Sequence, residues 1–343
     1  MNIPFSPPVH ELRKPYLLLL GDMEDRTHAK TALGLRDWCR EDCVGQLRFN
    51  DQAVDLGLPD LTVEQAREQG VGTLVIGITP SGGKLSETWH PALLAALEAG
   101  LDLASGLHVK LADIPAIADR ARQLGRTLHD VRHTPRRPEV GNGLKRTGKR
   151  MLMVGTDCVV GKKYTALALA RAMKARGVDA DFRATGQTGV LIAGRGVAVD
   201  AIISDFISGA AEAISPANHP DHWDIIEGQG SLYHPSFAAV TLGLVHGSQP
   251  DAMVLCHNPA RLHIADHPDY PIPPLGEAIE AYVAAARLTN KAARVVAISL
   301  NTEAFNEAQS ASLLQAAQSE TGLPSFDPVR SNLGPVLDAL GFG

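Results

Sequence analysis

The sequence lacks the features that would place it in several common classes. No run approaches the roughly 20 consecutive apolar residues that span a bilayer, so a membrane protein is not expected. Lys and Arg together number 32 against 38 for Asp and Glu, a formal net charge of −6. General nucleic-acid binders usually carry a basic excess, so none is expected here. The remaining expectation is a protein that acts on small-molecule substrates, with neither nucleic acid nor a membrane as partner.

Cysteines are also few, four in 343 residues. Their spacing fits neither a disulfide framework nor a zinc ribbon, and Cys39 and Cys43 are predicted to share one face of a helix. No export signal is visible, which predicts a cytoplasmic protein. The histidines at 257, 263 and 267 lie among prolines that break the helix of a zincin motif, so no metal site is expected. The sequence allows a homo-oligomer but does not indicate one.

What the sequence does contain is short apolar runs that alternate with stretches of helical period, the pattern of α/β proteins with parallel sheets. Residues 133–149 lack apolar periodicity and hold two prolines and three glycines, which predicts a linker. We therefore predict two domains with a cleft between them. One is a Rossmann-like domain over residues 1–140, although it lacks the GxGxxG fingerprint. The other is a P-loop domain over residues 141–343.

The same patterns predict individual elements. The predicted strands are 15–22, 71–78, 101–105, 127–131, 150–155, 180–184, 223–226, 252–256 and 295–300. The predicted helices are 89–99, 114–124, 164–176, 197–213, 237–245, 275–288 and 303–320, with one more that contains Ala29, Leu33 and Leu35.

The strongest functional signal is the segment MLMVGTDCVVGKKYT at residues 151–165. A strand, a glycine-bounded loop with lysines and a helix follow one another, as in a loop that binds phosphate through backbone N–H groups. Lys163 stands where a standard P-loop has its magnesium-binding hydroxyl, which disfavours magnesium-dependent NTP hydrolysis. The alternative is a glycine-rich turn with solvated lysines. The predicted cofactor-binding residues are Gly155, Thr156, Cys158, Gly161, Lys162, Lys163, Tyr164 and Thr165.

Two resemblances follow from such segments. GTDCVVGK and EGQGSL resemble the GTDTGVGKT and VEGAGG segments of dethiobiotin synthetase. A wider set resembles one bacterial and archaeal family, long catalogued as a domain of unknown function, with a Rossmann-like and a P-loop domain. That set comprises SGGKL, SGLH, GTDCVVGKK, RATGQTGVLIAG, DAIISDFISGAAE, EGQGSLYHP and CHNPARLHIADHPDYPIPPL.

The wider resemblance implies an activity, because the family includes a D-glutamate N-acetyltransferase. It implies an acyltransferase in which the amine of D-glutamate attacks the thioester of acetyl-CoA directly, with acetyl-CoA as co-substrate and its phosphates on the loop. Two alternatives stay open. One is an ATP-dependent ligase or kinase like dethiobiotin synthetase, and the other is a nucleotide-binding protein without catalysis.

Such a reaction needs a general base and donors for the oxyanion. Glu227 follows a buried strand and is a candidate base, or it orients the loop. Asp157 faces the acceptor's ammonium group or caps the helix, and Asp205 is a functional or structural carboxylate in a helix. His234 and His257 are further candidates, but the GxSxG elbow of a serine hydrolase is absent. Substrate-binding candidates are Arg183, which alternatively forms a surface salt bridge, and Gln187, Thr188, His257 and Arg261.

Overall fold

The computed structural model describes residues 5–80, 83 and 85–342. Three residues of the SGGKL segment, Ser81, Gly82 and Lys84, lie outside the described residues. The chain forms two compact units, each with a parallel sheet, which confirms the predicted α/β class with two sheets. Of the described residues, those within 8–135 and 186–201 form the N-terminal unit, and those within 5–7, 136–185 and 202–342 form the C-terminal unit. In the described part of the chain, no helix is both long and apolar enough to cross a membrane.

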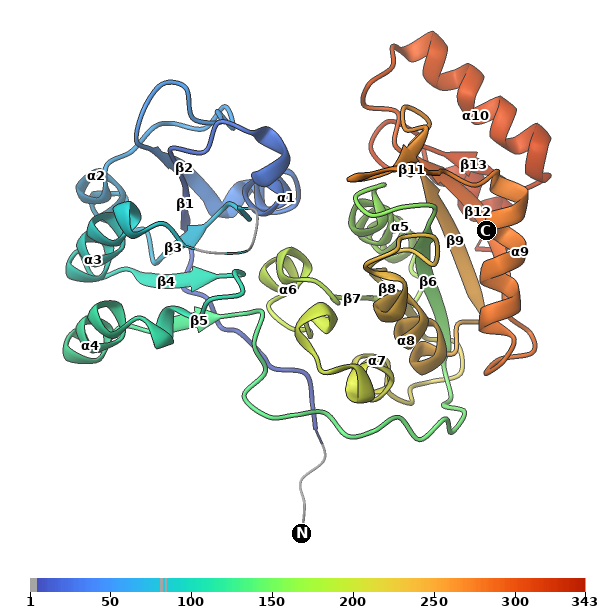
Figure 1. The fold of residues 1–343 in the computed structure, drawn as a ribbon, viewed down its shortest axis with the longest axis horizontal. Helices are drawn as coiled ribbons and strands as arrows, with labels where there is room; N and C mark the ends of the chain where they lie inside the picture. The colour runs from blue at the N-terminus through green and yellow to red at the C-terminus, as the bar shows by residue number, and fades with distance from the viewer. Residues whose placement is uncertain (1–4, 81–82, 84, 343) are drawn as a thin grey trace. The chain divides into compact units, whose positions relative to one another are not determined.

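The N-terminal unit is built on a five-stranded parallel sheet of order β2-β1-β3-β4-β5. Figure 1 shows α2, α3 and α4 along one face and α1 on the other. Helix α6 comes from the second half of the sequence, yet it packs against α1, where the hydroxyls of Thr31 and Thr188 lie 3.1 Å apart. The elements are β1 (Tyr16–Gly21), α1 (Lys30–Trp38), β2 (Cys43–Arg48), α2 (Val63–Glu68), β3 (Thr73–Ile76), α3 (His90–Glu98), β4 (Asp102–Ser105), α4 (Pro115–Leu124), β5 (Leu128–Asp130) and α6 (Gln187–Ala193).

Trp89 fills the carboxyl end of β1 in this unit. Its indole is 2% exposed, and Nε1 donates a 2.9 Å hydrogen bond to the carboxylate of Asp22. Gly21 has φ +60, and a Cβ there would lie 2.2 Å from the Trp89 ring. A dinucleotide-binding Rossmann domain keeps this position open for pyrophosphate. The end of β1, where a GxGxxG fingerprint would leave space for a dinucleotide, is thus filled by the side chain of Trp89.

The C-terminal unit has a six-stranded parallel sheet of order β13-β12-β9-β6-β8-β7, with helices on both faces (Figure 1). One core cluster joins the sheet to α5 and α11, and the other joins it to α8, α9 and α10. The strands are β6 (Lys149–Gly155), β7 (Ala180–Arg183), β8 (Trp223–Ile226), β9 (Ala252–His257), β12 (Arg294–Leu300) and β13 (Ser325–Phe326), with a hairpin of β10 (His263–Ile264) and β11 (His267–Pro271). The helices are α5 (Lys162–Ala175), α7 (Ile207–Ile214), α8 (Ala238–Ser248), α9 (Leu275–Ala286), α10 (Glu307–Thr321) and α11 (Gly334–Ala339).

Strand β6 shows why residues 151–154 are apolar at every position. Met151 and Met153 belong to the core cluster on the α5 face, whereas Leu152 and Val154 belong to the cluster on the α9 face. A parallel strand covered by helices on both faces buries successive side chains in opposite directions, so it reads as a continuous apolar run. All four side chains are 1% exposed. This strand forms the centre of the unit and leads directly into the loop at residues 156–161.

Two local predictions are wrong. The predicted helix 197–213 is two short 3-10 turns followed by α7, because the chain passes from the N-terminal to the C-terminal unit between residues 201 and 202. Asp205 consequently lies exposed in the turn Ser204–Phe206 rather than in a buried helix. Cys39 and Cys43 do not share a helix face, since α1 ends at Trp38 and Cys43 begins β2.

The close packing at the end of β8 leads to a prediction about two glycines. A Cβ at Gly228 would lie 1.7 Å from the carbonyl oxygen of Met153, whereas a Cβ at Gly276 in α9 would meet nothing within 4 Å. We expect Gly228→Ala to lower the free energy of unfolding by roughly 1–3 kcal/mol, because the backbone must shift. Gly276→Ala should raise it by up to about 1 kcal/mol, through helix propensity. Urea denaturation of both variants checks this, and equal effects would contradict the packing described.

Candidate functional site

The candidate site lies where three neighbouring strands of the C-terminal unit end. Strand β6 pairs with β8 on one side and β9 on the other. The chain builds β7 and β8 on one side of β6 and then crosses to β9 on the other, so the strand order reverses at β6. In open parallel sheets, ligands bind outside the carboxyl ends of the strands at such a reversal. The loop 156–161, Glu227 and His257 all emerge here.

Lys162 is the cation at the centre of this loop. Gly161, in the left-handed region with φ +105, turns the chain into α5, which begins at Lys162. The side chain of Lys162 is nevertheless buried, 7% exposed, and Nζ donates a 2.7 Å hydrogen bond to the carbonyl oxygen of Asp157. Burial lowers the pKa of this ammonium group. A cation held inside a loop at a helix N-terminus is suited to bind an anion, since the anion would offset this desolvation.

Gly228 makes room for this lysine. It follows Glu227 at the end of β8, and a Cβ there would lie 3.0 Å from Cδ of Lys162 as well as against Met153. The absence of a side chain at Gly228 therefore lets the end of β8 lie against both Met153 of β6 and the aliphatic part of Lys162. Glu227 itself is 3% exposed, and its Oε2 accepts a 2.9 Å hydrogen bond from the N–H of Thr185. The hydroxyl of Thr185 donates to the Glu227 carbonyl oxygen at 2.7 Å.

Asp157 is anchored rather than free to meet a substrate. It is 0% exposed, and its Oδ2 accepts hydrogen bonds from Nη1 of Arg261 at 2.8 Å and from the N–H of Ala265 at 2.9 Å. Its Oδ1 accepts from the N–H of Cys158 at 2.6 Å. Arg261 also donates to the Cys158 carbonyl oxygen at 2.7 Å. Two of the predicted site residues, Asp157 and Arg261, therefore bind each other.

The opposite side of the loop is held by Tyr282 of α9, which sequence reasoning missed. Its hydroxyl donates to the carbonyl oxygen of Gly155 at 2.7 Å and accepts from the N–H of Leu232 at 3.1 Å. The ring is fully buried, and burial raises the pKa of Tyr282 to about 12. The available signal was slight, since a buried tyrosine needs a partner for its hydroxyl but the sequence does not name that partner. Tyr282 thus links the end of β6 to the loop that follows β8.

His257 contacts the first loop residue. Its Nδ1 lies 3.0 Å from Oγ1 of Thr156, which is itself fully buried. Burial lowers the pKa of His257 to about 4. The imidazole is therefore neutral near neutral pH and takes part in the loop as a hydrogen-bonding group rather than as a cation.

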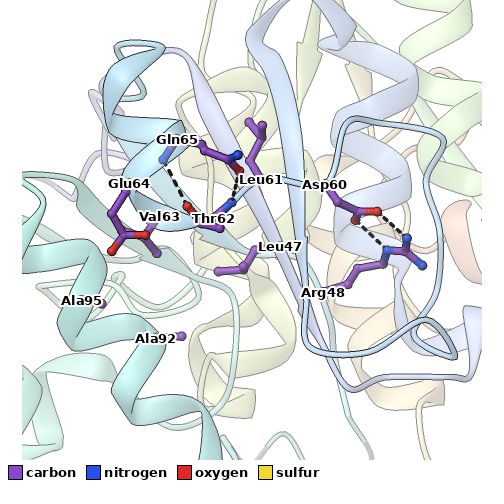
Figure 2. Close-up of a pocket in the computed structure, with 10 residues that line it drawn as sticks. All are labelled: Leu47, Arg48, Asp60, Leu61, Thr62, Val63, Glu64, Gln65, Ala92 and Ala95. Atoms are coloured by element: carbon purple, nitrogen blue, oxygen red, sulfur yellow. Dashed lines mark hydrogen bonds and ion pairs between the residues drawn. The ribbon is translucent and has the colours of Figure 1, made fainter.

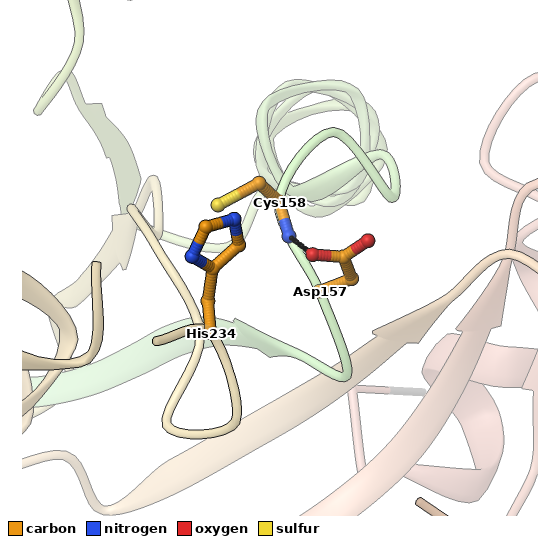
Figure 3. Close-up of side chains that lie close together, drawn as sticks. All are labelled: Asp157, Cys158 and His234. Carbon is orange, nitrogen blue, oxygen red and sulfur yellow. Dashed lines mark hydrogen bonds between the residues drawn. The ribbon is translucent and has the colours of Figure 1, made fainter. Parts of the chain in front are cut away.

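His234 lies on the loop after β8 and faces residues 157 and 158, as Figure 3 shows. One polar atom each from Asp157, Cys158 and His234 lie within 4.8 Å of one another, a spacing that a metal ion could use. The Asp157 carboxylate is, however, already engaged by a guanidinium and two N–H groups. An ion would have to displace these donors, so we assign no metal site to this group.

Six further predicted site residues lie in other environments. Arg183 donates to Asp224 at 2.6 Å beside His222, inside an ion-pair network at the end of β7. Thr165 is fully buried, where its hydroxyl bonds to Gly161 and Ser299 rather than facing the loop. Gln187 and Thr188 belong to the N-terminal unit. Lys163 and Tyr164 occupy the first turn of α5, with Nζ of Lys163 5.4 Å from the Tyr164 ring centre.

A surface cavity of about 340 Å³ lies elsewhere, in the N-terminal unit (Figure 2). Its walls come from the end of β2, from α2 and from α3, where Ala92 and Ala95 line it. Several of its polar groups have structural partners. Arg48 pairs with Asp60, and the hydroxyl of Thr62 caps α2. The carboxylate of Glu64 also lines this cavity, whereas the buried polar groups described above gather at the loop of the C-terminal unit.

Comparisons with known proteins match both parts of the chain. A sequence profile of the P-loop domain of DUF1611, a domain of unknown function, matches residues 139–337, and a profile of the Rossmann-like domain of the same family matches residues 47–134. A D-glutamate N-acetyltransferase from Tritonibacter scottomollicae is 49% identical over 329 residues, 96% of this chain and 99% of that protein. One from a Pseudoalteromonas species is 45% identical over 327 residues, 95% and 98% of the two chains.

A solved structure is also similar. The crystal structure of a DUF1611 family protein from Anabaena variabilis superposes with a TM-score of 0.85 at 36% identity, and the match covers 96% of this chain and 100% of that one. The likeness therefore extends over both units.

The buried His257 leads to a prediction about pH. The pKa of His257 falls from 6.5 to about 4 on folding. Between these values the unfolded chain binds more protons, so the free energy of unfolding should decrease as pH falls from 6.5 to 4. The loss attributable to His257 is up to about 3 kcal/mol. We expect His257→Asn, which keeps a polar group near Thr156, to lose less stability over this range. Denaturation at several pH values checks this, and parallel wild-type and variant profiles would contradict it.

Proposed function

The chain belongs to the DUF1611 family, and we propose that it transfers the acetyl group of acetyl-CoA to the amine of D-glutamate. Its similarity to two D-glutamate N-acetyltransferases over nearly the full length supports the reaction. The observation that carries the assignment of the donor site is the buried Lys162 at the N-terminus of α5. We place the phosphates of CoA at this loop.

Two features favour CoA over a nucleotide that is hydrolysed with magnesium. Lys163 occupies the position of the metal-binding hydroxyl in a standard P-loop. Thr165, two residues later, has its hydroxyl between Gly161 and Ser299 in the interior. A site that only holds phosphate needs backbone N–H groups, a helix dipole and a cation, and none of these requires a metal.

The length of CoA separates the phosphate site from the reacting carbonyl. The pantetheine arm is a chain of more than a dozen bonds, so it spans roughly 15 Å when extended. An extended arm would therefore place the thioester away from the loop, whereas a folded arm would bring it back. Glu227 packs beside the loop, and we propose it as the general base in a pose in which the arm folds back toward the end of β8.

The proposed transfer has two steps, an addition and an elimination. The neutral amine adds to the thioester carbon, and Glu227 takes the proton that the nitrogen loses. The C–S bond then breaks, CoA leaves as the thiolate and the acetyl group remains on nitrogen as an amide. For a carboxylate of D-glutamate we propose Arg261. Its contacts with Asp157 and Cys158 both use Nη1, and a guanidinium has five N–H donors.

Ligand binding and turnover test the function directly. Acetyl-CoA and CoA should raise the thermal stability of the protein, because a ligand that binds only the folded state stabilises it by mass action. ATP with magnesium should raise it less. Acetylation of D-glutamate should be detectable by release of the CoA thiol. A stability gain from ATP with magnesium but not from acetyl-CoA would instead favour a ligase or kinase.

Substitution of Lys162 tests the donor site. Lys162→Ala should weaken acetyl-CoA binding about 10- to 150-fold, because a charge-assisted hydrogen bond contributes about 1.5–3 kcal/mol. Lys174→Ala is the matched control, since Lys174 lies on the same helix and pairs with Asp181 at the surface. Titration calorimetry measures both affinities. Equal acetyl-CoA affinities for the two variants would show that the loop is not part of the donor site.

Substitution of Glu227 tests the general base. Glu227→Gln keeps the size of the side chain but cannot accept a proton, so kcat should fall roughly 10²–10⁴-fold with acetyl-CoA affinity little changed. Glu212→Gln is the control, because Glu212 accepts hydrogen bonds from the backbone of Asn142 and Gly143 away from the loop. Wild-type turnover in Glu227→Gln would exclude it as the base. Loss of acetyl-CoA affinity would show that it organises the loop instead.

A further inference from the structure

The imidazole of His234 is held in one tautomer. The backbone N–H of Ser236 donates a 3.1 Å hydrogen bond to Nδ1. Because a backbone N–H can only donate, Nδ1 must be the unprotonated nitrogen, and the neutral ring carries its proton on Nε2. His234 therefore has no free lone pair with which to act as a base. It can act as a donor through Nε2–H, which meets no hydrogen-bond acceptor among the residues that the structure describes.

The surroundings keep this ring neutral and fixed. His234 is 3% exposed, with Phe237 at 4.5 Å and His267 at 5.0 Å between ring centres. Burial lowers the pKa of His234, with His267 and Lys162 acting in the same direction and Asp157 and Asp266 against it. A second proton would have to sit on Nδ1, where it would face the N–H of Ser236.

The ring also lies at the loop that holds Lys162. It approaches Cys158 and Asp157 to within 4.8 Å (Figure 3). The Asp157 carboxylate is engaged by Arg261, Ala265 and Cys158, so it has a full set of donors without His234. The Nε2–H of His234, the ammonium group of Lys162 and the N-terminus of α5 together make a set of donors for an oxyanion.

We propose that neutral His234 donates through Nε2 to a phosphate oxygen of CoA and completes the anion site formed by Lys162 and the N-terminus of α5. This role rests on the proposed function, and it makes His234 a donor-binding residue rather than a base. The bound oxyanion is a CoA phosphate and not a carboxylate of the acceptor, because Lys162 and the N-terminus of α5 are the donors assigned to the phosphates, whereas Arg261 is the residue proposed for the acceptor's carboxylate.

Two substitutions at position 234 test this assignment. His234→Leu removes the donor, and His234→Gln keeps a neutral N–H near the place of Nε2. Calorimetry should show acetyl-CoA binding about 10- to 150-fold weaker for His234→Leu, and within about tenfold of wild type for His234→Gln. The loss in His234→Leu should also appear as a higher KM for acetyl-CoA. His219→Leu, at an exposed histidine with 69% side-chain exposure, is the control.

Each contrary result has a distinct meaning. Equal acetyl-CoA affinity in His234→Leu and wild type would overturn the proposal, as would His234→Gln binding as weakly as His234→Leu. A loss of affinity for D-glutamate alone, with acetyl-CoA binding intact, would also overturn it and would show that His234 binds the acceptor's carboxylate.

If His234→Leu does not fold, ¹⁵N NMR of the wild-type histidines tests the proposal instead, since a proton on Nδ1 would overturn the donor role. A wild-type protein that binds acetyl-CoA but does not acetylate D-glutamate would overturn the proposed function alone.

Discussion

A carboxylate buried without contact with water must be surrounded by donors, and Asp157 draws its donors from two separate segments of the chain. Cys158 follows it in the loop, whereas Arg261 and Ala265 lie more than a hundred residues further along. Removing any one donor would leave a buried anion partly unsatisfied, which is costly in a low dielectric. The loop after β6 and the hairpin region after β9 are therefore fixed to each other. With Tyr282 on the other side, the conformation of residues 155–161 is set before any ligand arrives, so a ligand need not offset the cost of ordering it.

Helices and strands that are determined by their own residues could be predicted from the sequence. Strand β6 and helix α5 follow from a continuous apolar run, a left-handed glycine and a helical period, and their bounds agree with prediction to within two residues. Polar partners could not be predicted in this way. Asp157 and Arg261 are each predicted as site residues from the sequence. They are 104 residues apart, and neither segment indicates that they form an ion pair with each other. Their pairing depends on β6 and β9 being neighbours in the sheet, which only the three-dimensional order of strands decides.

The failure at residues 197–213 has the same origin on a larger scale. Apolar residues there serve two different cores, since Val197, Ala198 and Val199 are buried in the N-terminal unit whereas Ile207 is buried in the C-terminal one. Periodicity assumes that one segment faces one core, and a segment that changes units breaks this assumption. Asp205 lies in the interval and is exposed for that reason. The same limit applies to α6, whose sequence neighbours belong to the P-loop sheet although the helix packs against α1.

The position of Thr165 separates the role proposed for this loop from that of a loop that hydrolyses nucleotides. In a loop that hydrolyses nucleotides, the hydroxyl holds a metal at the bond that breaks. Here the hydroxyl is bonded within the interior, which leaves Lys162 and backbone donors as a static anion site. In the proposed reaction the phosphates do not change, so interactions with them are equal in the ground state and the transition state. Binding energy from such a remote part of a substrate can offset the entropy of positioning its reactive end. The loop would then increase the rate by positioning the thioester. The residues that gain or lose a proton would lie near the thioester, either at the far end of the extended pantetheine arm or where the arm folds back.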